Sequence, residues 1–149
     1  MYSIGQVSKM FDLPIPTLRY YDKEGLFQDL EREPSGIRKF NEKSIEALRV
    51  IECLKKSGMQ IKKIREFMNW CSQGDRTLEK RKEMFYARRQ EIEKQMEELQ
   101  RTLDMVKFKC WYYETACKEG TEVNMPQHIE KDMPADIVQC YENAHADKL

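Results

Sequence analysis

The sequence predicts a mainly helical protein, in which a small head of short helices and one hairpin is followed by a single long helix. Three observations predict this fold class. Apolar residues recur at helical spacing through residues 1–76, between proline and glycine turn signals. No glycine or proline occurs from Thr77 to Glu119. Over that stretch apolar residues return every seven positions, which is the period of a coiled coil.

The composition excludes several classes of protein. Of the 149 residues, 35% are charged and 40% are hydrophobic. No apolar run approaches the roughly 20 residues that cross a bilayer, and residues 1–20 lack the unbroken apolar core of a signal peptide. The five cysteines are odd in number and include no CxxC pair, which argues against a disulfide scaffold. We therefore expect a cytoplasmic protein with no membrane partner.

The net charge of zero conceals an asymmetry along the chain. Residues 1–76 carry 14 Lys and Arg against 11 Asp and Glu, a net charge of +3. Residues 77–149 carry 12 against 15, a net charge of −3. A basic head joined to an acidic rear suggests that only the head meets a polyanion.

The first two helices of the head are set by a cap and a proline. Ser3 and Gln6 form a capping-box pattern, which predicts a helix over about residues 4–11. Pro16 suits the first turn of a second helix, over about residues 17–24. Two short helices that lie about four residues apart are a helix-turn-helix pattern.

A hairpin and two further helices complete the predicted head. The turn residues Pro34 to Gly36 indicate a two-stranded hairpin within residues 26–40. Asn41 can cap a third helix over about residues 42–57. A fourth helix is expected over residues 61–72, where apolar residues again recur at helical spacing.

The long helix predicted over residues 77–119 carries a stripe of apolar residues, which we call the seam. A lone helix of this length has no core, so it must bury the seam on a partner, most simply a second copy of the chain. Folding back onto its own head is the alternative. After Gly120 we expect a loosely folded acidic tail. The seam, as the expected dimer interface, consists of Ile92, Met96, Leu99, Leu103, Val106, Cys110 and Tyr113.

Several stretches of the head carry a family resemblance. They are Tyr2–Val7, Thr17–Asp22, Gly25–Leu26 and Gly36–Phe40. In this order and spacing they resemble the MerR family of bacterial transcription regulators. Residues 48–64 fit the family's second helix pair, and the long helix fits its dimerisation coiled coil, so the resemblance covers residues 1–119. Pro14 and Phe40 depart from the pattern, which often has a small polar cap and a tyrosine at these positions.

The resemblance implies three domains and a function. Residues 1–76 would form a winged helix-turn-helix DNA-binding domain, residues 77–119 a dimerisation helix that pairs antiparallel in a coiled coil, and residues 120–149 a short acidic C-terminal tail. Members of the family bind double-stranded promoter DNA as homodimers. On binding an effector they distort the DNA and so realign the promoter for RNA polymerase. We therefore expect a sequence-specific DNA-binding transcription regulator.

The candidate DNA-binding residues lie on three elements. In the second helix Leu18 and Tyr21 share one face and are expected to pack inward, although core packing of Tyr20 is an alternative. The hairpin and the fourth helix, where the family has its wings, add basic side chains, for which a merely solvated surface is the alternative. The candidates are Thr17, Arg19, Tyr20, Arg38, Lys39, Lys62 and Lys63.

The sensing chemistry has two candidate sites. The context of Cys53 resembles a branch of the family that senses aldehydes and other electrophiles through one thiol, and nearby cations favour a thiolate. A buried structural cysteine is the alternative. Trp111, Tyr112 and Cys117 are candidates for a small-molecule effector pocket, or else they complete the dimer interface.

No metal or other cofactor is expected. Cys110 and Cys117 lie about 10.5 Å apart along one helix and cannot bind one metal within a chain. Both histidines, His128 and His145, lie in the tail without a metal-binding or catalytic spacing, so an enzyme is not expected. Two rival functions remain: a coiled-coil protein-interaction module without sequence-specific DNA binding, and an architectural DNA-binding protein that resembles the excisionases.

Overall fold

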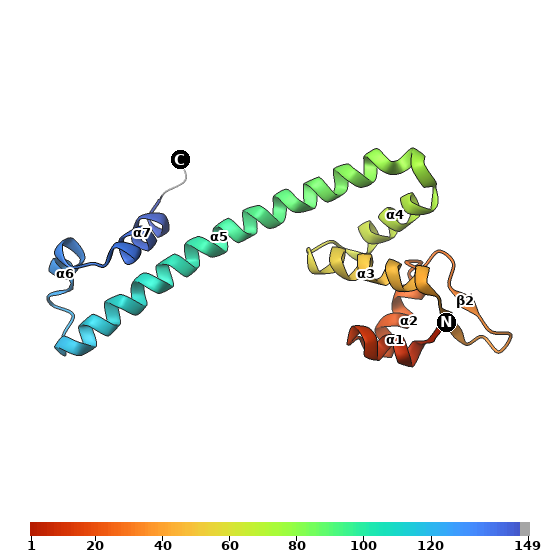
Figure 1. The fold of residues 1–149 in the computed structure, drawn as a ribbon, viewed down its shortest axis with the longest axis horizontal. Coiled ribbons are helices and arrows are strands. Elements are labelled where there is room, and N and C mark those ends of the chain that lie inside the picture. The colour runs from red at the N-terminus through yellow and green to blue at the C-terminus, as the bar shows by residue number, and fades with distance from the viewer. Residues whose placement is uncertain (147–149) are drawn as a thin grey trace. The chain divides into compact units, whose positions relative to one another are not determined.

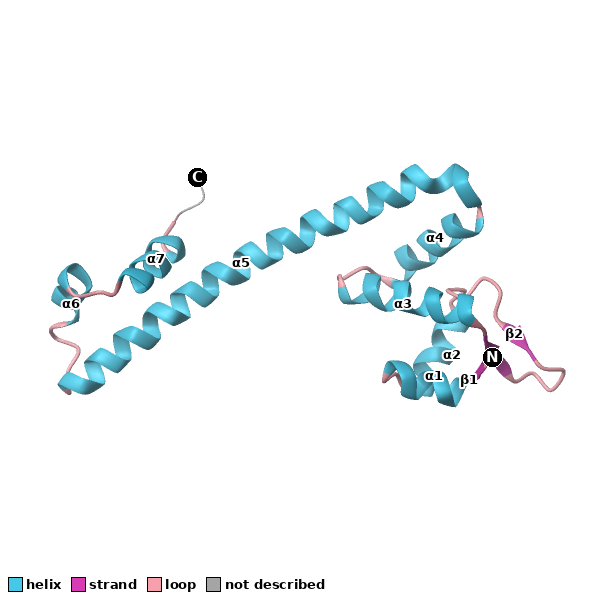
Figure 2. Cartoon of the chain, viewed as in Figure 1, coloured by secondary structure: helices cyan, strands magenta, loops and turns pink. Residues whose placement is uncertain are grey.

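The computed structural model describes residues 1–146 and is mainly helical, as predicted (Figures 1 and 2). The chain divides into two compact units, Met1–Arg88 and Arg89–Leu149. The division falls within the long helix α5 (Leu78–Glu119). Within the residues described, no helix is both long and apolar enough to cross a membrane.

The first unit begins with the helix-turn-helix pair α1 (Ile4–Phe11) and α2 (Ile15–Lys23). The capping box is present, because the Gln6 amide donates to Ser3 Oγ and the Ser3 amide donates to Gln6 Oε1. Asp12 ends α1 in the left-handed conformation, with a φ of 53°. Helix α2 starts two residues earlier than predicted, and Pro16 lies in its first turn, as expected.

The wing is a three-stranded antiparallel sheet with strand order β1-β3-β2. Strands β2 (Glu31–Arg32) and β3 (Arg38–Phe40) form the predicted hairpin. Strand β1 (Tyr2–Ser3) pairs with the other edge of β3 and was not predicted. A two-residue strand has too few positions to show an alternating pattern, so the sequence carries no signal for it.

Two further helices, α3 (Glu42–Lys56) and α4 (Ile61–Ser72), complete the head at the predicted positions. Asn41 caps α3 by accepting from the Ser44 amide. The buried cluster draws on all four helices and the wing. Its members are Val7, Leu18, Tyr21, Leu26, Phe27, Phe40, Ile45, Leu48, Ile51, Leu54, Met59, Ile64, Phe67 and Met68.

The start of α5 is fixed to the head by a short 3-10 turn, η1 (Gly74–Thr77). The buried Thr77 hydroxyl lies 2.5 Å from the Trp70 carbonyl oxygen. Arg81 donates to the Gly74 carbonyl over 2.9 Å and to Thr77 Oγ1 over 3.1 Å. These bonds satisfy backbone carbonyl groups at the end of α4 and in η1, and they anchor the first turn of α5 to η1.

The second unit contains the rest of α5 together with α6 (Met125–Lys131) and α7 (Ala135–Ala144). The prediction of a loosely folded tail was therefore wrong. Phe108 of α5 is buried against Tyr141 of α7, with ring centroids 4.9 Å apart. Pro126 lies in the first turn of α6 and Pro134 caps α7, so both prolines start helices.

Candidate nucleic-acid interface

Helix α2 has one buried and one exposed face. Leu18 and Tyr21 are 0% and 1% exposed, as the spacing predicted. Arg19 and Tyr20 are exposed, and Thr17 is half-buried. The alternative in which Tyr20 packs into the core is therefore wrong. Arg19 and Tyr20 are therefore available to a ligand, and Thr17 is partly accessible.

Tyr21 fixes the orientation of α2 against α3. Its hydroxyl donates to Glu52 Oε1 over 2.8 Å and accepts from Lys55 Nζ, also over 2.8 Å. Burial is the main cause that raises the pKa of Tyr21, and the Glu52 carboxylate adds to the rise. The phenol therefore stays protonated at neutral pH and keeps its donor. Because α2 is held by both packing and hydrogen bonds, its exposed face is rigid.

The candidate cations differ in what they already bind. Arg19 and Lys62 form no ion pair or hydrogen bond with any residue in the part of the chain that the structure describes. Lys63 pairs with Glu66 at 3.3 Å and Lys39 with Glu33 at 3.1 Å. Exposed pairs of this kind are weak, so both lysines can exchange their carboxylate for a phosphate at small cost.

The wing is joined to α2 through a single carboxylate. Asp22 Oδ2 accepts from Arg38 Nε over 2.6 Å and from Arg32 Nη2 over 2.5 Å. Arg32 Nη1 also donates to the Gly36 carbonyl in the hairpin turn. The sequence analysis named Arg38 and missed Asp22 and Arg32. The available signal was the position of Arg32 directly opposite Arg38 in the hairpin, where two like charges need a partner.

Cys53 is exposed on α3, so the alternative of a buried structural cysteine is wrong. Two of the cations that the sequence placed near its thiol bind elsewhere in the structure. Arg49 pairs with Glu46 at 3.1 Å, and Lys55 donates to the Tyr21 hydroxyl. The thiol is accessible to a reagent, and its role in sensing stays a prediction.

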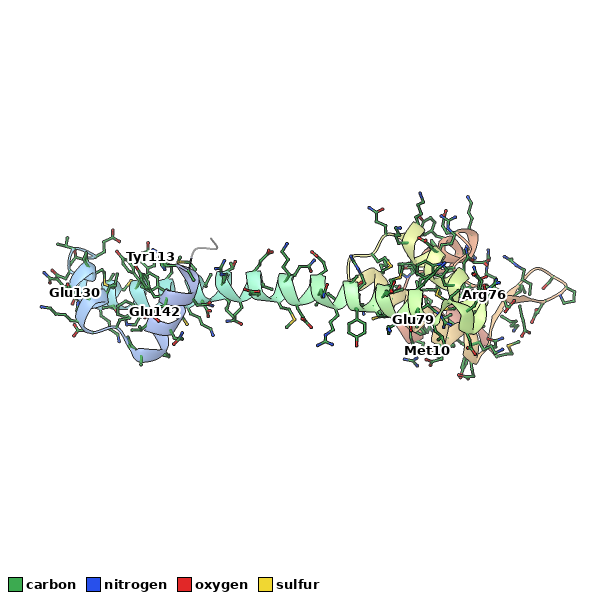
Figure 3. All side chains as sticks on the ribbon, turned by 90° about the horizontal axis from the view of Figure 1, so that it is seen from above. Met10, Arg76, Glu79, Tyr113, Glu130 and Glu142 are labelled. Atoms are coloured by element: carbon green, nitrogen blue, oxygen red, sulfur yellow. The ribbon has the colours of Figure 1, made fainter. Side chains whose placement is uncertain are left out.

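The seam on α5 is uncovered in the single chain. Its exposed fractions run from 36% at Ile92 to 69% at Leu99. Side chains project from the helix along the middle of α5, and Tyr113 projects from it farther along (Figure 3). Such a row of exposed apolar side chains is expected of a surface that binds a partner.

The residues suggested for an effector pocket are only partly brought together. Trp111 and Tyr112 are half-buried, and their rings lie 6.1 and 6.2 Å from the ring of Phe108. Cys117 is exposed one and a half turns farther along α5. The two rings therefore help to cover Phe108, and their use as a ligand site stays a prediction.

Known proteins share both the sequence and the fold of this chain. Residues 2–70 match the MerR helix-turn-helix family of regulatory proteins, and residues 45–107 match the MerR DNA-binding family. An uncharacterised helix-turn-helix regulator from Haemophilus influenzae is 34% identical over 128 residues, which are 85% of this chain and 95% of that protein. The Bacillus subtilis transcriptional regulator AdhR is 38% identical over 90 residues, which are 60% of this chain and 64% of AdhR.

A solved structure extends the match to three dimensions. It is HiNmlR, a MerR family regulator lacking the sensor domain, in a crystal with promoter DNA. The TM-score is 0.72 with 33% identity, over 81% of this chain and 96% of that one. Sequence and fold therefore agree over the helix-turn-helix head and the long helix. The chain belongs to the MerR family of helix-turn-helix transcriptional regulators.

Proposed function

We propose that the chain is a homodimeric transcription regulator that binds double-stranded promoter DNA with the exposed face of α2. The observation that carries this proposal is the pair Arg19 and Tyr20, which the buried Leu18 and Tyr21 hold out toward solvent. A helix of this kind reads base edges in the major groove while neighbouring cations hold phosphates. A relative with the same fold that binds promoter DNA, HiNmlR, supports the assignment. A regulatory role, and not catalysis, is what these relatives favour.

Each group of candidate residues has its own chemical task. Arg19 can donate two parallel hydrogen bonds to a guanine edge or a phosphate, and Thr17 and Tyr20 offer hydroxyls and an apolar ring beside it. Arg38 and Lys39 of the wing would hold the phosphate backbone. Lys62 and Lys63 would do the same from the first turn of α4, a helix end at which anions are favoured. The proposed DNA-binding residues are Thr17, Arg19, Tyr20, Arg38, Lys39, Lys62 and Lys63.

Dimerisation would use the seam. Helix α5 has 42 residues, about 60 Å at 1.5 Å per residue. Two copies that pair antiparallel cover both seams and place one head at each end of the rod, which suits a two-fold symmetric operator. In this proposal residues 1–76 bind DNA, residues 77–119 form the dimer, and residues 120–149 are a C-terminal segment.

We infer a two-state mechanism in which an effector favours the dimer that distorts the promoter, so that RNA polymerase can use it. Bending or untwisting DNA costs several kcal/mol, which the effector's differential affinity must supply. The accessible Cys53 thiol supports modification as the signal, and the aromatic pair Trp111 and Tyr112 with Cys117 is the second candidate site. In this mechanism the protein needs no cofactor or metal and acts in the cytoplasm, where the promoter DNA is.

The test starts from duplexes selected out of a random-sequence pool by the purified protein. Fluorescence anisotropy should show affinity that falls about 10³-fold between 50 and 200 mM salt, if six to ten phosphates are bound. Arg19→Ala should weaken binding by about 1–3 kcal/mol, or about 5- to 150-fold, and relax the selected sequence. The matched control is Arg76→Ala, which removes the same charge from the exposed η1 turn and should change affinity less than about twofold.

Two outcomes would contradict the proposal. Selection that yields no preferred sequence, together with a dimer in sedimentation, would favour the coiled-coil interaction module instead. Unchanged affinity of Arg19→Ala for the selected duplex would show that the exposed face of α2 does not read DNA.

A further inference from the structure

A single carboxylate oxygen gathers two arginines at the base of the wing. Asp22 is at the C-terminal end of α2, and its side chain is only 11% exposed. Arg32 and Arg38 both donate to its Oδ2 atom, at 2.5 and 2.6 Å. The two guanidinium groups therefore lie within about 5 Å of each other, a distance at which like charges repel.

The hairpin register makes this contact more than an incidental ion pair. Arg32 of β2 and Arg38 of β3 are direct cross-strand partners. Like charges that face each other across two strands destabilise the pair. A hairpin selected for stability alone would carry opposite charges here, as it does one position away, where Glu31 faces Lys39. The structure instead keeps both arginines and provides Asp22 to compensate.

Both arginines retain free donors beyond Asp22. Arg38 uses only Nε, so its Nη1 and Nη2 groups have no partner among the residues that the structure describes. Arg32 is 47% exposed and keeps its Nε and further Nη hydrogens. A guanidinium fixed through one edge presents the other edge in a defined direction, which is the geometry that phosphate oxygens accept.

We propose that Asp22 is a positioning residue that holds Arg32 and Arg38 as a paired clamp for one stretch of DNA phosphates, and that Arg32 is itself a phosphate-binding residue. This inference rests on the proposed function, since it assigns additional residues to the same DNA-binding face. It also explains why an acidic residue lies at the end of a helix that approaches a polyanion.

The sign of one substitution separates positioning from simple electrostatics. Asp22→Asn removes a negative charge close to DNA, so Coulomb attraction alone would make binding tighter. If Asp22 positions the two arginines, the same change frees them to separate and binding becomes weaker. The two explanations therefore predict opposite directions for one measurement.

The experiment uses a mixed-sequence 30-base-pair DNA duplex, because phosphate contacts do not depend on sequence. The full chain is titrated by anisotropy from 50 to 200 mM salt. We expect Asp22→Asn to bind about tenfold more weakly than wild type at 100 mM salt. Arg32→Ala should lower the slope of log affinity against log salt by about one phosphate contact. Asp29→Asn, the control, removes the charge of an exposed carboxylate near the same strands and should bind as tightly as wild type or more tightly.

A structural role for Asp22 is excluded by repeating the change where both arginines are absent. In an Arg32→Ala, Arg38→Ala chain, Asp22→Asn should no longer weaken binding, whereas damage to the wing itself would still weaken it. Circular dichroism melting of each variant identifies any chain that fails to fold. If an Asp22→Asn chain fails to fold, the slope of log affinity against log salt for Arg32→Ala decides whether the clamp binds phosphate.

Three results would overturn the inference. If the Asp22→Asn variant folds and binds the duplex as tightly as wild type, or more tightly, Asp22 does not position the arginines. An unchanged salt slope for Arg32→Ala removes the phosphate contact. A wild-type chain that does not bind the duplex at 50 mM salt would refute the proposed function itself. The clamp alone is refuted when wild type binds and the variants bind equally well.

Discussion

The head and the rear unit bury their apolar residues in different ways. In the head, fourteen buried side chains form one continuous cluster. In the described part of residues 89–149, the buried side chains are Asp104, Phe108, Ala116 and Met125, while the seam lies exposed. The head is thus a folding unit with its own core, whereas in the proposed dimer the rear unit would supply half of an interface. The stability of the head should therefore not depend on protein concentration, whereas that of the seam should.

The largest expected effect comes from a charge placed in the seam. Leu99→Asp lies near the middle of α5 and is 69% exposed in the single chain, so it costs little in a monomer. In an antiparallel dimer it would bury two unpaired carboxylates close together, which is strongly unfavourable. We expect sedimentation velocity to show monomers, and binding to a palindromic duplex to weaken by more than about 100-fold as the second head is lost.

The control for this variant is Gln90→Asp, which adds the same charge on an exposed face of α5 outside the seam. It should remain dimeric. A Leu99→Asp chain that still sediments as a dimer would show that the exposed apolar row is not the interface.

The next largest effect lies in the core of the head. Leu48 is completely buried, so Leu48→Ala leaves a cavity and should lower the free energy of unfolding by about 2–5 kcal/mol. Urea denaturation followed by tryptophan fluorescence should give this loss at every protein concentration. Met96→Ala, at a seam position 65% exposed in the single chain, should instead leave the head transition unchanged and weaken the dimer. If the loss in the free energy of unfolding caused by Leu48→Ala depended on protein concentration, the head would not be a folding unit independent of the dimer.

The sequence predicted the elements whose boundaries are marked by local chemistry. Ser3 with Gln6, and Asn41, satisfy backbone groups within three residues, so they identify helix starts without knowledge of the fold. The same holds for the inward face of α2, because Leu18 and Tyr21 lie three positions apart on one helix.

The missed features depend on contacts between distant segments. Strand β1 exists because Tyr2 pairs with Phe40, and a two-residue segment shows no period of its own. Helix α7 is held by residues about 40 positions away, since Asn143 donates to Asp104 of α5. The role of Asp22 likewise depends on Arg38, sixteen residues farther along the chain. Tertiary partners of this kind leave no signature at fixed spacing.

The smallest expected effect is a pH dependence at the end of the rear unit. His128 of α6 contacts Glu119, the last residue of α5, through Nε2 and lies 3.0 Å from Asp132 through Nδ1. The hydrogen bond to Glu119 is the main cause that raises the pKa of His128 above its usual 6.5, and the hydrogen bond to Asp132 adds to the rise. A histidine whose pKa is raised by folding stabilises the fold below the unfolded pKa, and this contribution is lost as the pH rises through the folded value.

The measurement that follows is an NMR titration of the His128 ring in the folded chain and in urea. We expect the folded ring to titrate at the higher pH. The melting temperature should also fall more between pH 6 and pH 8.5 in wild type than in His128→Gln, because glutamine keeps hydrogen bonding but cannot gain a proton. The head does not contain this pair, so Leu48→Ala should retain the wild-type pH dependence. A folded His128 that titrates at or below its value in urea would show that the two carboxylates do not hold the proton. The attachment of α6 to α5 would then depend on the burial of Met125 and on the hydrogen bond that Asn124 Nδ2 donates to Glu119.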